Sequence, residues 1–212
     1  MNIIRRPFRY ANYNAVYWLI GINFIIFAAT YFIGPRYQHF LITRLSMIPI
    51  LVMEGWVWSF VTYMFMHGSF QHILFNMLGL FIFGMHVERQ MGSSEFLLFY
   101  FVTGTLAGIF SFIMYYVTGN HIVALMGASG ALYAVQLAYA IFFPHAVIYI
   151  WGLIPLRAPV MVLGFTALSL FFVASGRGGN VAHLTHLAGF AFAWLYFMIR
   201  YGVSPWRRLT GR

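Results

Sequence analysis

The chain contains no cysteine, no lysine and no aspartate, and only three of its 212 residues are acidic. The lack of cysteine excludes disulfides, thiolate catalysis and thiolate-ligated metal sites, although it does not identify the compartment. Charged residues make up 7% of the chain and hydrophobic residues 62%, whereas about a quarter of a soluble domain is charged. This composition excludes an ordinary soluble domain and indicates an integral membrane protein.

Long uncharged stretches separate the few charged residues, as from Gly55 to Val87 and from Phe96 to Leu156. A membrane span needs about 20 apolar residues, so the second stretch holds two spans, interrupted near residues 119–121. The pattern predicts an all-α membrane protein with six spans near residues 14–33, 72–87, 95–117, 127–143, 158–174 and 181–201. We expect a single membrane domain over residues 1–212, with a core at about 14–201 and a short basic tail at each end.

All twelve basic residues are arginine, and most lie near the two ends of the chain. The N-terminal group is Arg5, Arg6 and Arg9, and the C-terminal group is Arg200, Arg207, Arg208 and Arg212. Basic residues concentrate on the cytoplasmic side of membrane proteins, so we expect both termini in the cytoplasm and an even number of spans. Arg89 and Arg157 then also face inward, and Arg36, Arg44 and Arg177 face outward.

The net charge of +9 is interpreted as this topology signal, with anionic membrane lipid as the partner and not nucleic acid. The inward bias of arginine and the helical spans favour a bacterial inner (plasma) membrane. The connection between the first two spans, residues 34–70, is long and contains Trp56 and Trp58. Tryptophan concentrates where hydrocarbon meets water, so this loop is expected to lie in the membrane interface.

Polar side chains inside the predicted spans are few, and such residues are usually functional or tightly paired. His72 and Asn76 are four residues apart, and His183 and His186 are three apart, so each pair shares a helix face. Taken alone, each pair is equally compatible with hydrogen bonding between neighbouring helices.

The stretch ALMGASGALYA, residues 124–134, places Gly127, Ala128, Ser129 and Gly130 at the start of the fourth predicted span. Tyr133 follows one turn later on the same side. Taken alone, such a cluster of small residues indicates close helix packing, and Tyr133 is an ordinary core residue. Gly104-xxx-Gly108 and Gly189-xxx-Ala193 are interpreted as packing faces in the same way.

Taken together, these residues contain the parts of a serine hydrolase. A serine nucleophile needs a base to remove its proton and donors for the oxyanion that forms when it attacks a carbonyl. Ser129 could supply the nucleophile, His186 or His183 the base, and His72 and Asn76 the side-chain donors. The flanking glycines would allow the backbone N–H groups and a substrate strand to approach closely.

A carboxylate to complete a catalytic triad is missing. The acidic residues are Glu54, Glu88 and Glu95, and none is expected near a histidine of the sixth span. The pattern therefore predicts a Ser–His dyad whose imidazole is held by packing, with Tyr133 as the expected neighbour.

The same residues, in this order, resemble the rhomboid intramembrane serine proteases, from about Trp58 to Ala193. The family's GxSG motif corresponds to residues 127–130, and its tyrosine to Tyr133. Further correspondences are His72 and Asn76 for the His-xxx-Asn pattern, His67 for an upstream histidine, and His186, Gly189 and Ala193 for the sixth-span pattern. Gly84-xxx-Glu88 with Gly92, and the stretch FFPHAVIYIWGLIPL, resemble two of the family's connections between spans.

The resemblance implies that Ser129 is the nucleophile and His186 the general base. It implies an oxyanion site formed by His72, Asn76 and the Ser129 backbone N–H, with Gly127, Gly130, Tyr133 and Gly189 in support. It also implies six spans, of which the fourth starts short, so that the serine opens into a water-filled cavity. The substrates would be single-span membrane proteins cut near the outer face, and no cofactor or metal is implied.

One residue departs from the family pattern. The family often has Trp-Arg in the outer loop before the second span, whereas this chain has Trp58-Ser59. The resemblance therefore leaves the support of this loop unexplained, while the predicted dyad is unaffected.

Two other functions compete with proteolysis. A catalytically inactive relative would bind membrane proteins without cutting them, although such relatives typically lose the serine or the histidine. A tetrahedral metal site could instead be built from His67, His72, His183 and His186. A channel or solute carrier is less favoured, because no inverted repeat is visible.

Overall fold

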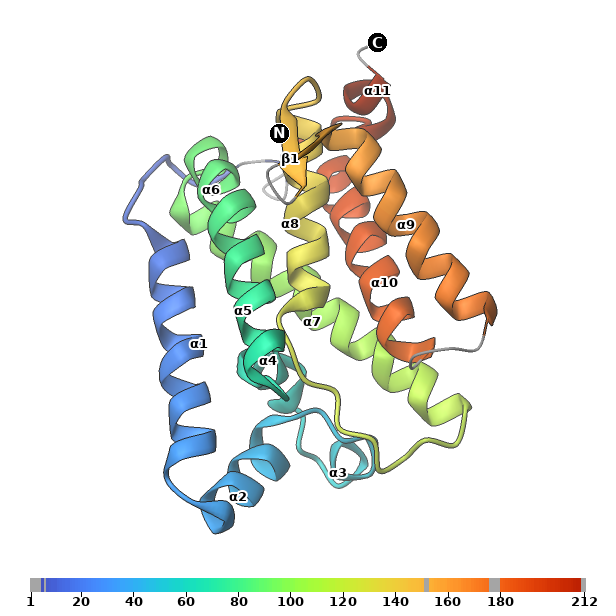
Figure 1. Ribbon diagram of the computed structural model, residues 1–212. Helices are drawn as coiled ribbons and strands as arrows, with labels where there is room; N and C mark the ends of the chain where they lie inside the picture. Colours follow the sequence, from blue (N-terminus) through green and yellow to red (C-terminus); the bar gives the residue numbers. More distant parts are fainter. Residues whose placement is uncertain (1–4, 6, 151–152, 176–179, 211–212) are drawn as a thin grey trace.

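The structure is a computed structural model that describes residues 5, 7–150, 153–175 and 180–210. The described part is a bundle of helices with one small hairpin (Figure 1). Three arginines used in the topology prediction, Arg6, Arg177 and Arg212, lie outside the described residues. Five described helices are long and apolar enough to cross a membrane: Ala15–Phe32, Phe70–Met91, Ser93–Val117, Ala158–Ser175 and Val181–Tyr201. The chain is therefore a multi-pass membrane protein.

These spans are built from the following elements. The first, third and fourth of these five long helices are α1 (Ala15–Phe32), α7 (Ser93–Val117) and α9 (Ala158–Ser175) in Figure 1. The second is continuous through α5 (Phe70–Gly79), the π-helical η3 (Leu80–Gly84) and α6 (Met85–Met91). The last combines α10 (Asn180–Tyr196) with the π-helical η4 (Phe197–Tyr201), and α11 (Pro205–Thr210) follows it.

The fourth predicted span is the apolar helix α8, Ser129–Phe142, which has 14 residues. At 1.5 Å per residue it is about 21 Å long, which is shorter than the roughly 30 Å hydrocarbon core of a bilayer. The sequence predicted a short fourth span, and the six-span count remains a prediction.

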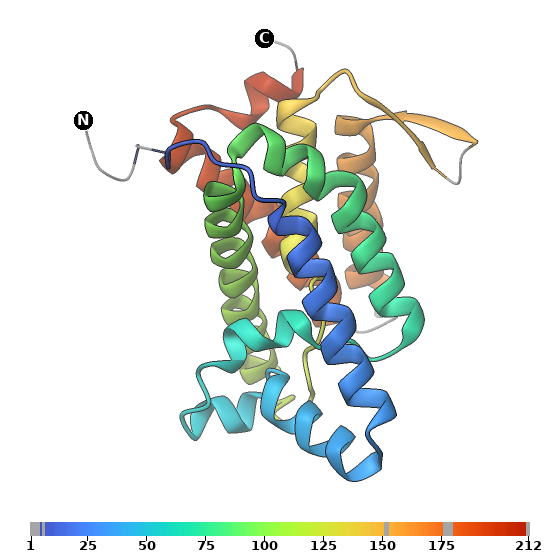
Figure 2. The same cartoon turned by 90° about the vertical axis from the view of Figure 1, so that its left-hand side faces the viewer.

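Helix α8 lies in the middle of the bundle (Figure 1), and the view of Figure 2 shows it between α7 and α9. Ten of its residues are buried, most of them alanine, leucine or valine. A helix that is apolar on all sides can be enclosed by others, and its small side chains allow them to approach closely. This central helix carries Ser129 at its first turn.

Close packing explains the glycine pairs. A Cβ atom added to Gly104 would lie 2.1 Å from Met64 Sδ, and one added to Gly108 would lie 2.7 Å from Tyr63 Cε1. Met64 and Tyr63 belong to η2 (Tyr63–Phe65). The predicted packing role of these two α7 glycines is therefore confirmed, with a 3-10 turn as the partner.

Residues 34–70 are largely helical. They form α2 (Pro35–Leu45), α3 (Pro49–Met53), α4 (Ser59–Thr62) and η2. Proline opens α2 and α3, and its fixed φ angle and missing N–H suit the first helical position. The prediction of a loop missed these short helices because their hydrophobic pattern is too brief to show a period.

An arginine does support this region, but it comes from α2. The Arg44 guanidinium lies 4.5 Å from the ring centroid of Trp56, and Trp58 Nε1 donates a 3.0 Å hydrogen bond to the Arg44 carbonyl. The rings of Trp56 and Trp58 are stacked, with centroids 5.4 Å apart. Ser59, where the family often has arginine, donates to the Trp56 carbonyl at 2.7 Å.

The half of the bundle where α1 begins and α11 ends is called here the terminal half. Glu88 of α6 accepts hydrogen bonds from the N–H groups of Ala15 and Val16 at 2.6 and 3.0 Å, and from the Ser93 hydroxyl. These N–H groups open α1 and have no partner within the helix. Glu88 therefore caps α1 from a distant part of the sequence.

Glu95, in the first turn of α7, ties α10 to α7 in the same half. Its carboxylate accepts two hydrogen bonds from Arg200, at 2.7 and 2.8 Å, and one from the Tyr196 hydroxyl at 2.6 Å. The Phe8 N–H donates to the same group at 3.2 Å. None of these hydrogen-bond partners of Glu88 and Glu95 is a histidine.

A short antiparallel hairpin, which the all-α prediction missed, connects α8 and α9. Strand β1 (Val147–Ile150) pairs with β2 (Ile154–Arg157) in a register that places Val147 opposite Arg157. The strands contain valine, isoleucine and tyrosine, which favour extended structure. Trp151 and Gly152, which the sequence comparison of this connection included, lie outside the described residues.

Candidate active site

Ser129 is the first residue of α8 and follows a connection that the loop region holds in place. Met47 and Leu125 exchange backbone hydrogen bonds of 3.1 and 2.9 Å, and the Gly127 N–H donates to the Tyr63 carbonyl at 3.0 Å. The half of the bundle containing these residues and Ser129 is called the serine half. Met47 and Tyr63, from the region between α1 and α5, therefore hold the backbone that leads into Ser129.

His186 of α10 contacts this serine directly. Its Nε2 atom lies 2.9 Å from Ser129 Oγ, within hydrogen-bond distance. If the hydroxyl donates to Nε2, the neutral imidazole carries its proton on Nδ1, because only one ring nitrogen is protonated in that state. This arrangement allows Nε2 to accept the serine proton.

Ring packing holds the His186 imidazole. Tyr133 of α8 stacks on it, with ring centroids 4.2 Å apart and an interplanar angle of 13°. Phe190 lies against the Tyr133 ring at 5.0 Å. Among the residues that the structure describes, none forms a hydrogen bond with His186 Nδ1. The sequence offered no carboxylate to hold the His186 imidazole, and in the structure the Tyr133 ring packs against it instead.

A backbone contact between two glycines brings the serine and the histidine together. A Cβ atom added to Gly189 of α10 would lie only 2.1 Å from the carbonyl oxygen of Gly130. Any larger residue at position 189 would push α8 and α10 apart. The predicted supporting roles of Gly130 and Gly189 therefore have a steric basis in this structure.

His72 of α5 faces the loop beside the serine. A Cβ atom added to Gly127 would lie 2.6 Å from His72 Nε2, and Gly127 has a φ angle of +118°, which disfavours other residues. The Gly68 N–H donates to His72 Nδ1 at 3.4 Å. Because Nδ1 accepts, the proton of a neutral His72 lies on Nε2, which faces the Ser129 loop and can donate there.

Asn76 lies one turn further along α5 and is buried. One N–H of its amide donates to the His72 carbonyl at 2.8 Å, which leaves its second N–H for another acceptor. Asn76 does not belong to the set of residues that line the cavity at Ser129. Its role as an oxyanion donor remains a prediction.

The cavity at the serine has a volume of about 160 Å³. It is lined by Tyr63, His72, Leu125, Met126, Gly127, Ser129, Ala182, Thr185 and His186. Sequence reasoning missed Tyr63, Met126 and Thr185. Tyr63 looks like any other aromatic residue of this chain, and only the structure shows its hydroxyl bonded to the Gly104 carbonyl at 2.7 Å. Thr185 could have been noticed as the polar neighbour of His186.

The other two histidines of the predicted metal-site set, His67 and His183, lie against other rings, whereas His186 contacts Ser129. His183 stacks on Phe172 of α9, with centroids 4.7 Å apart and an interplanar angle of 13°. His67 is buried against His72, with centroids 5.0 Å apart. Within the described residues, no three histidine or acidic side chains lie close enough together to hold a metal ion. The four histidines of the metal-site alternative are therefore not gathered there into one cluster.

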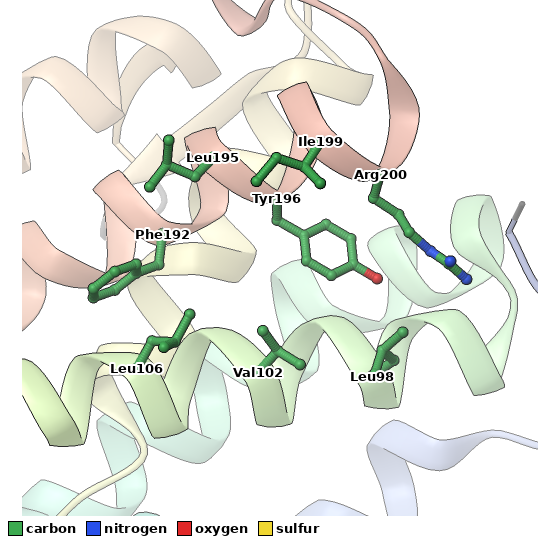
Figure 3. Close-up of a pocket in the computed structure, with 8 residues that line it drawn as sticks. All are labelled: Leu98, Val102, Leu106, Phe192, Leu195, Tyr196, Ile199 and Arg200. Carbon is green, nitrogen blue, oxygen red and sulfur yellow. The ribbon is translucent and has the colours of Figure 1, made fainter. Parts of the chain in front are cut away.

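A second hollow, of about 520 Å³, lies between α7 and α10 (Figure 3). Its lining is Leu98, Val102, Leu106, Phe192, Leu195, Tyr196, Ile199 and Arg200. Figure 3 shows mostly apolar side chains along it, with Tyr196 near the middle and Arg200 near one end. These two polar groups belong to the Glu95 network, so the groove offers no nucleophile or base of its own.

The geometry at Ser129 can therefore activate a hydroxyl and offers donors beside it. The Rhomboid domain family matches residues 54–202 of this chain. The rhomboid protease GlpG of Haemophilus influenzae is 39% identical over 79 residues, covering 37% of this chain and 38% of that protein. Rhomboid protein 1, mitochondrial, of Saccharomyces cerevisiae is 30% identical over 190 residues, covering 86% and 52%.

A third relative, the rhomboid protease AarA of Providencia stuartii, is 27% identical over 158 residues. That match covers 66% of this chain and 54% of the relative, so the chain spans less than two thirds of each of these three proteins. The family match covers both Ser129 and His186, and reaches from the end of α3 to just past η4. The chain belongs to the rhomboid family of intramembrane serine proteases.

Proposed function

We propose that this protein is an intramembrane serine endopeptidase in which Ser129 is the nucleophile and His186 the general base. The 2.9 Å contact between His186 Nε2 and Ser129 Oγ is the observation that carries the proposal. Serine is a weak nucleophile unless a base accepts its proton, and an imidazole within hydrogen-bond reach is suited to that task.

The reaction follows from this pair. Ser129 Oγ attacks the carbonyl carbon of the scissile peptide bond while His186 Nε2 takes the hydroxyl proton. The tetrahedral intermediate collapses, the C–N bond breaks, and His186 passes the proton to the leaving amine. Water then attacks the acyl-enzyme with His186 again as base, which releases the acid product and restores Ser129. No cofactor enters any step.

The developing oxyanion would lie beside the first turn of α8. The first N–H groups of a helix lack intrahelical partners and carry partial positive charge, so the Ser129 N–H is suited to receive it. His72 Nε2–H supplies a side-chain donor on the same side of the Gly127 loop. Asn76 is the second proposed donor, through the N–H that does not bond His72.

The substrates proposed are single-span membrane proteins cut near the outer face of the membrane. Six spans and cytoplasmic termini are part of this proposal. It is supported by the start of α1 and the end of α11 at the same end of the bundle (Figure 1), together with Arg89 and Arg157. We further propose that the short α8 starts below the outer membrane surface, where irregular backbone is tolerated if it lines a water-filled cavity. A bacterial inner membrane is the proposed location.

The test uses a fluorescent phosphonate that reacts with activated serines, on detergent-solubilised wild type, Ser129→Ala and His186→Ala. Wild type alone should be labelled, and both variants should lose cleavage of a single-span substrate by roughly 10³-fold or more while keeping the thermal unfolding midpoint. A folded wild type that resists labelling would instead favour a relative that binds without cutting. Full activity of Ser129→Ala would refute the scheme.

A further inference from the structure

A contact between two buried hydroxyls joins α7 to α10 beside the candidate active site. Ser111 Oγ of α7 lies 2.6 Å from Thr185 Oγ1 of α10, and the two residues are 0% and 2% exposed. Thr185 directly precedes His186 in the chain and lines the cavity at Ser129. The pair therefore connects α7, which carries no residue of the predicted active site, to the helix of the proposed base.

The number of protons shows that this contact is a hydrogen bond between the two helices. Ser111 Oγ also lies 2.7 Å from the carbonyl oxygen of Ala107, and Thr185 Oγ1 lies 2.8 Å from that of Val181. A hydroxyl has only one proton to donate, and two oxygens at 2.6 Å repel each other unless a proton lies between them. One hydroxyl must therefore donate to the other and release the carbonyl of its own helix. Bonding within each helix would satisfy both hydroxyls, so the contact serves to join α7 to α10.

The other branch of the Thr185 side chain faces α8. A Cβ atom added to Gly130 would lie 3.3 Å from Thr185 Cγ2 and 3.0 Å from the Cβ atom of Ala107. Thr185 thus presents its hydroxyl to α7 and its methyl group to the backbone next to Ser129. Because a β-branched side chain has few allowed χ1 rotamers, a hydrogen bond to the hydroxyl also fixes the methyl group against α8.

The alignment of His186 depends on how α10 is placed. Within the described part of the chain, His186 Nδ1 has no hydrogen-bond partner, so the 2.9 Å contact with Ser129 Oγ relies on ring stacking and on the position of α10. The backbone contact between Gly130 and Gly189 sets the distance between α8 and α10. Such a contact is not directional, whereas a hydrogen bond is. The bond at Thr185, one residue before the base, therefore restrains the rotation of α10 about its own axis.

We propose that Ser111 and Thr185 are positioning residues of the dyad, whose shared hydrogen bond holds α10 against α7 and thereby aligns His186 with Ser129. Neither hydroxyl enters a chemical step. The inference rests on the proposed protease function, and it adds α7 to the helices that determine the reactivity of the serine.

The experiment compares two readouts on the same detergent-solubilised variants. The first is the rate of Ser129 labelling by a small water-soluble phosphonate, and the second is kcat and KM for a single-span substrate. Thr185→Val removes the hydroxyl and keeps the shape, Thr185→Ser keeps the hydroxyl, and Ser111→Ala removes the partner. The matched control is Thr103→Val, since the buried Thr103 hydroxyl of α7 donates to carbonyls of its own helix.

Thr185→Val is expected to slow labelling and kcat by roughly 5- to 10-fold, the effect of one lost hydrogen bond, with KM little changed. Thr185→Ser and Thr103→Val should stay within about twofold of wild type. Because one bond is shared, Ser111→Ala should cause the same loss, and the double variant should be no slower than either single one. The hydroxyl that remains keeps a carbonyl of its own helix as acceptor, so the unfolding midpoint should fall by less than about 4 °C.

Several results would overturn the inference. Labelling of Thr185→Val at the wild-type rate would show that His186 does not need this bond. An equal loss in Thr103→Val, or no recovery in Thr185→Ser, would assign the effect to the general packing of the helices. Additive losses in the double variant would mean that the two hydroxyls act separately. Failure of wild type itself to react would refute the protease function and this inference with it, which keeps the two kinds of failure distinguishable.

Discussion

The polar side chains of the scaffold and of the site differ in their hydrogen bonding between the two halves of the bundle. In the terminal half, Glu88 and Glu95 each accept several hydrogen bonds that tie the N-terminal segment, α7 and α10 together. In the serine half, His186 Nδ1 and the Asn76 carbonyl oxygen have no hydrogen-bond partner among the described residues. Strong charge-assisted bonds hold the scaffold, whereas ring packing holds the site and leaves its polar atoms available to a substrate.

The comparison predicts that removing a hydrogen-bonded charge from the terminal half lowers the stability of the protein but does not change the reactivity of Ser129. Glu95→Gln leaves Arg200 beside a neutral group, and removing one partner of a buried ion pair typically costs about 3–5 kcal/mol. The Arg200 and Glu95 side chains are 12% and 0% exposed, so solvent can compensate little. We expect a lower unfolding midpoint in detergent, with unchanged phosphonate labelling per folded molecule.

The exposed Glu54→Gln is the control for this variant, and it should change the free energy of unfolding by less than about 0.5 kcal/mol. A loss of labelling in folded Glu95→Gln would contradict the division between the two halves.

Removing His72 should have the reverse effect. His72→Ala deletes the proposed oxyanion donor, and the loss of one such donor lowers kcat by about 10²–10³-fold. The unfolding midpoint should change little, because the imidazole faces a cavity and its Nδ1 bond from Gly68 is long, at 3.4 Å. Substrate kinetics with His72→Gln, which keeps a donor, provide the comparison. Equal losses in both variants would argue against a donor role.

The buried His67, in the serine half, is expected to make the stability of the protein sensitive to acid. Burial, together with the neighbouring His72, lowers the pKa of His67 to about 3 from its ordinary value of 6.5. The unfolded chain therefore binds this proton more readily, and stability falls as the pH drops below 6.5. At pH 5 the loss is about 2 kcal/mol. Thermal unfolding of wild type and His67→Gln at pH 7 and pH 5 measures it, and the same acid shift in both would exclude His67 as its source.

The smallest effect is expected in the outer loop. Arg44→Ala removes the guanidinium over Trp56, and an exposed cation–π contact contributes about 0.5–1 kcal/mol. Arg44→Lys should retain part of it. If Arg44→Ala instead abolished labelling, the loop would be coupled to Ser129 far more strongly than these contacts indicate.

Much of the site could be predicted from the sequence because its chemistry uses rare residue types at fixed helical spacings. Ser129 and His186 stand out in an apolar chain, and the structure places them in contact. The short helices between residues 35 and 65 could not be predicted from periodicity over so few residues. Apart from Ser93, the hydrogen-bond partners of Glu88 and Glu95 lie 72 to 105 residues away in the sequence, so only the fold reveals them.

The contact between Gly130 and Gly189 has a mechanical consequence. With two backbones touching, no side chain lies between α8 and α10 at this point to rearrange and allow one helix to slide or tilt against the other. This pair is therefore a stiff contact between the two helices, and we expect Ser129 and His186, which lie beside it, to move together. Helix α9 has few buried residues, so its motions can leave the distance between the Ser129 hydroxyl and the His186 imidazole unchanged.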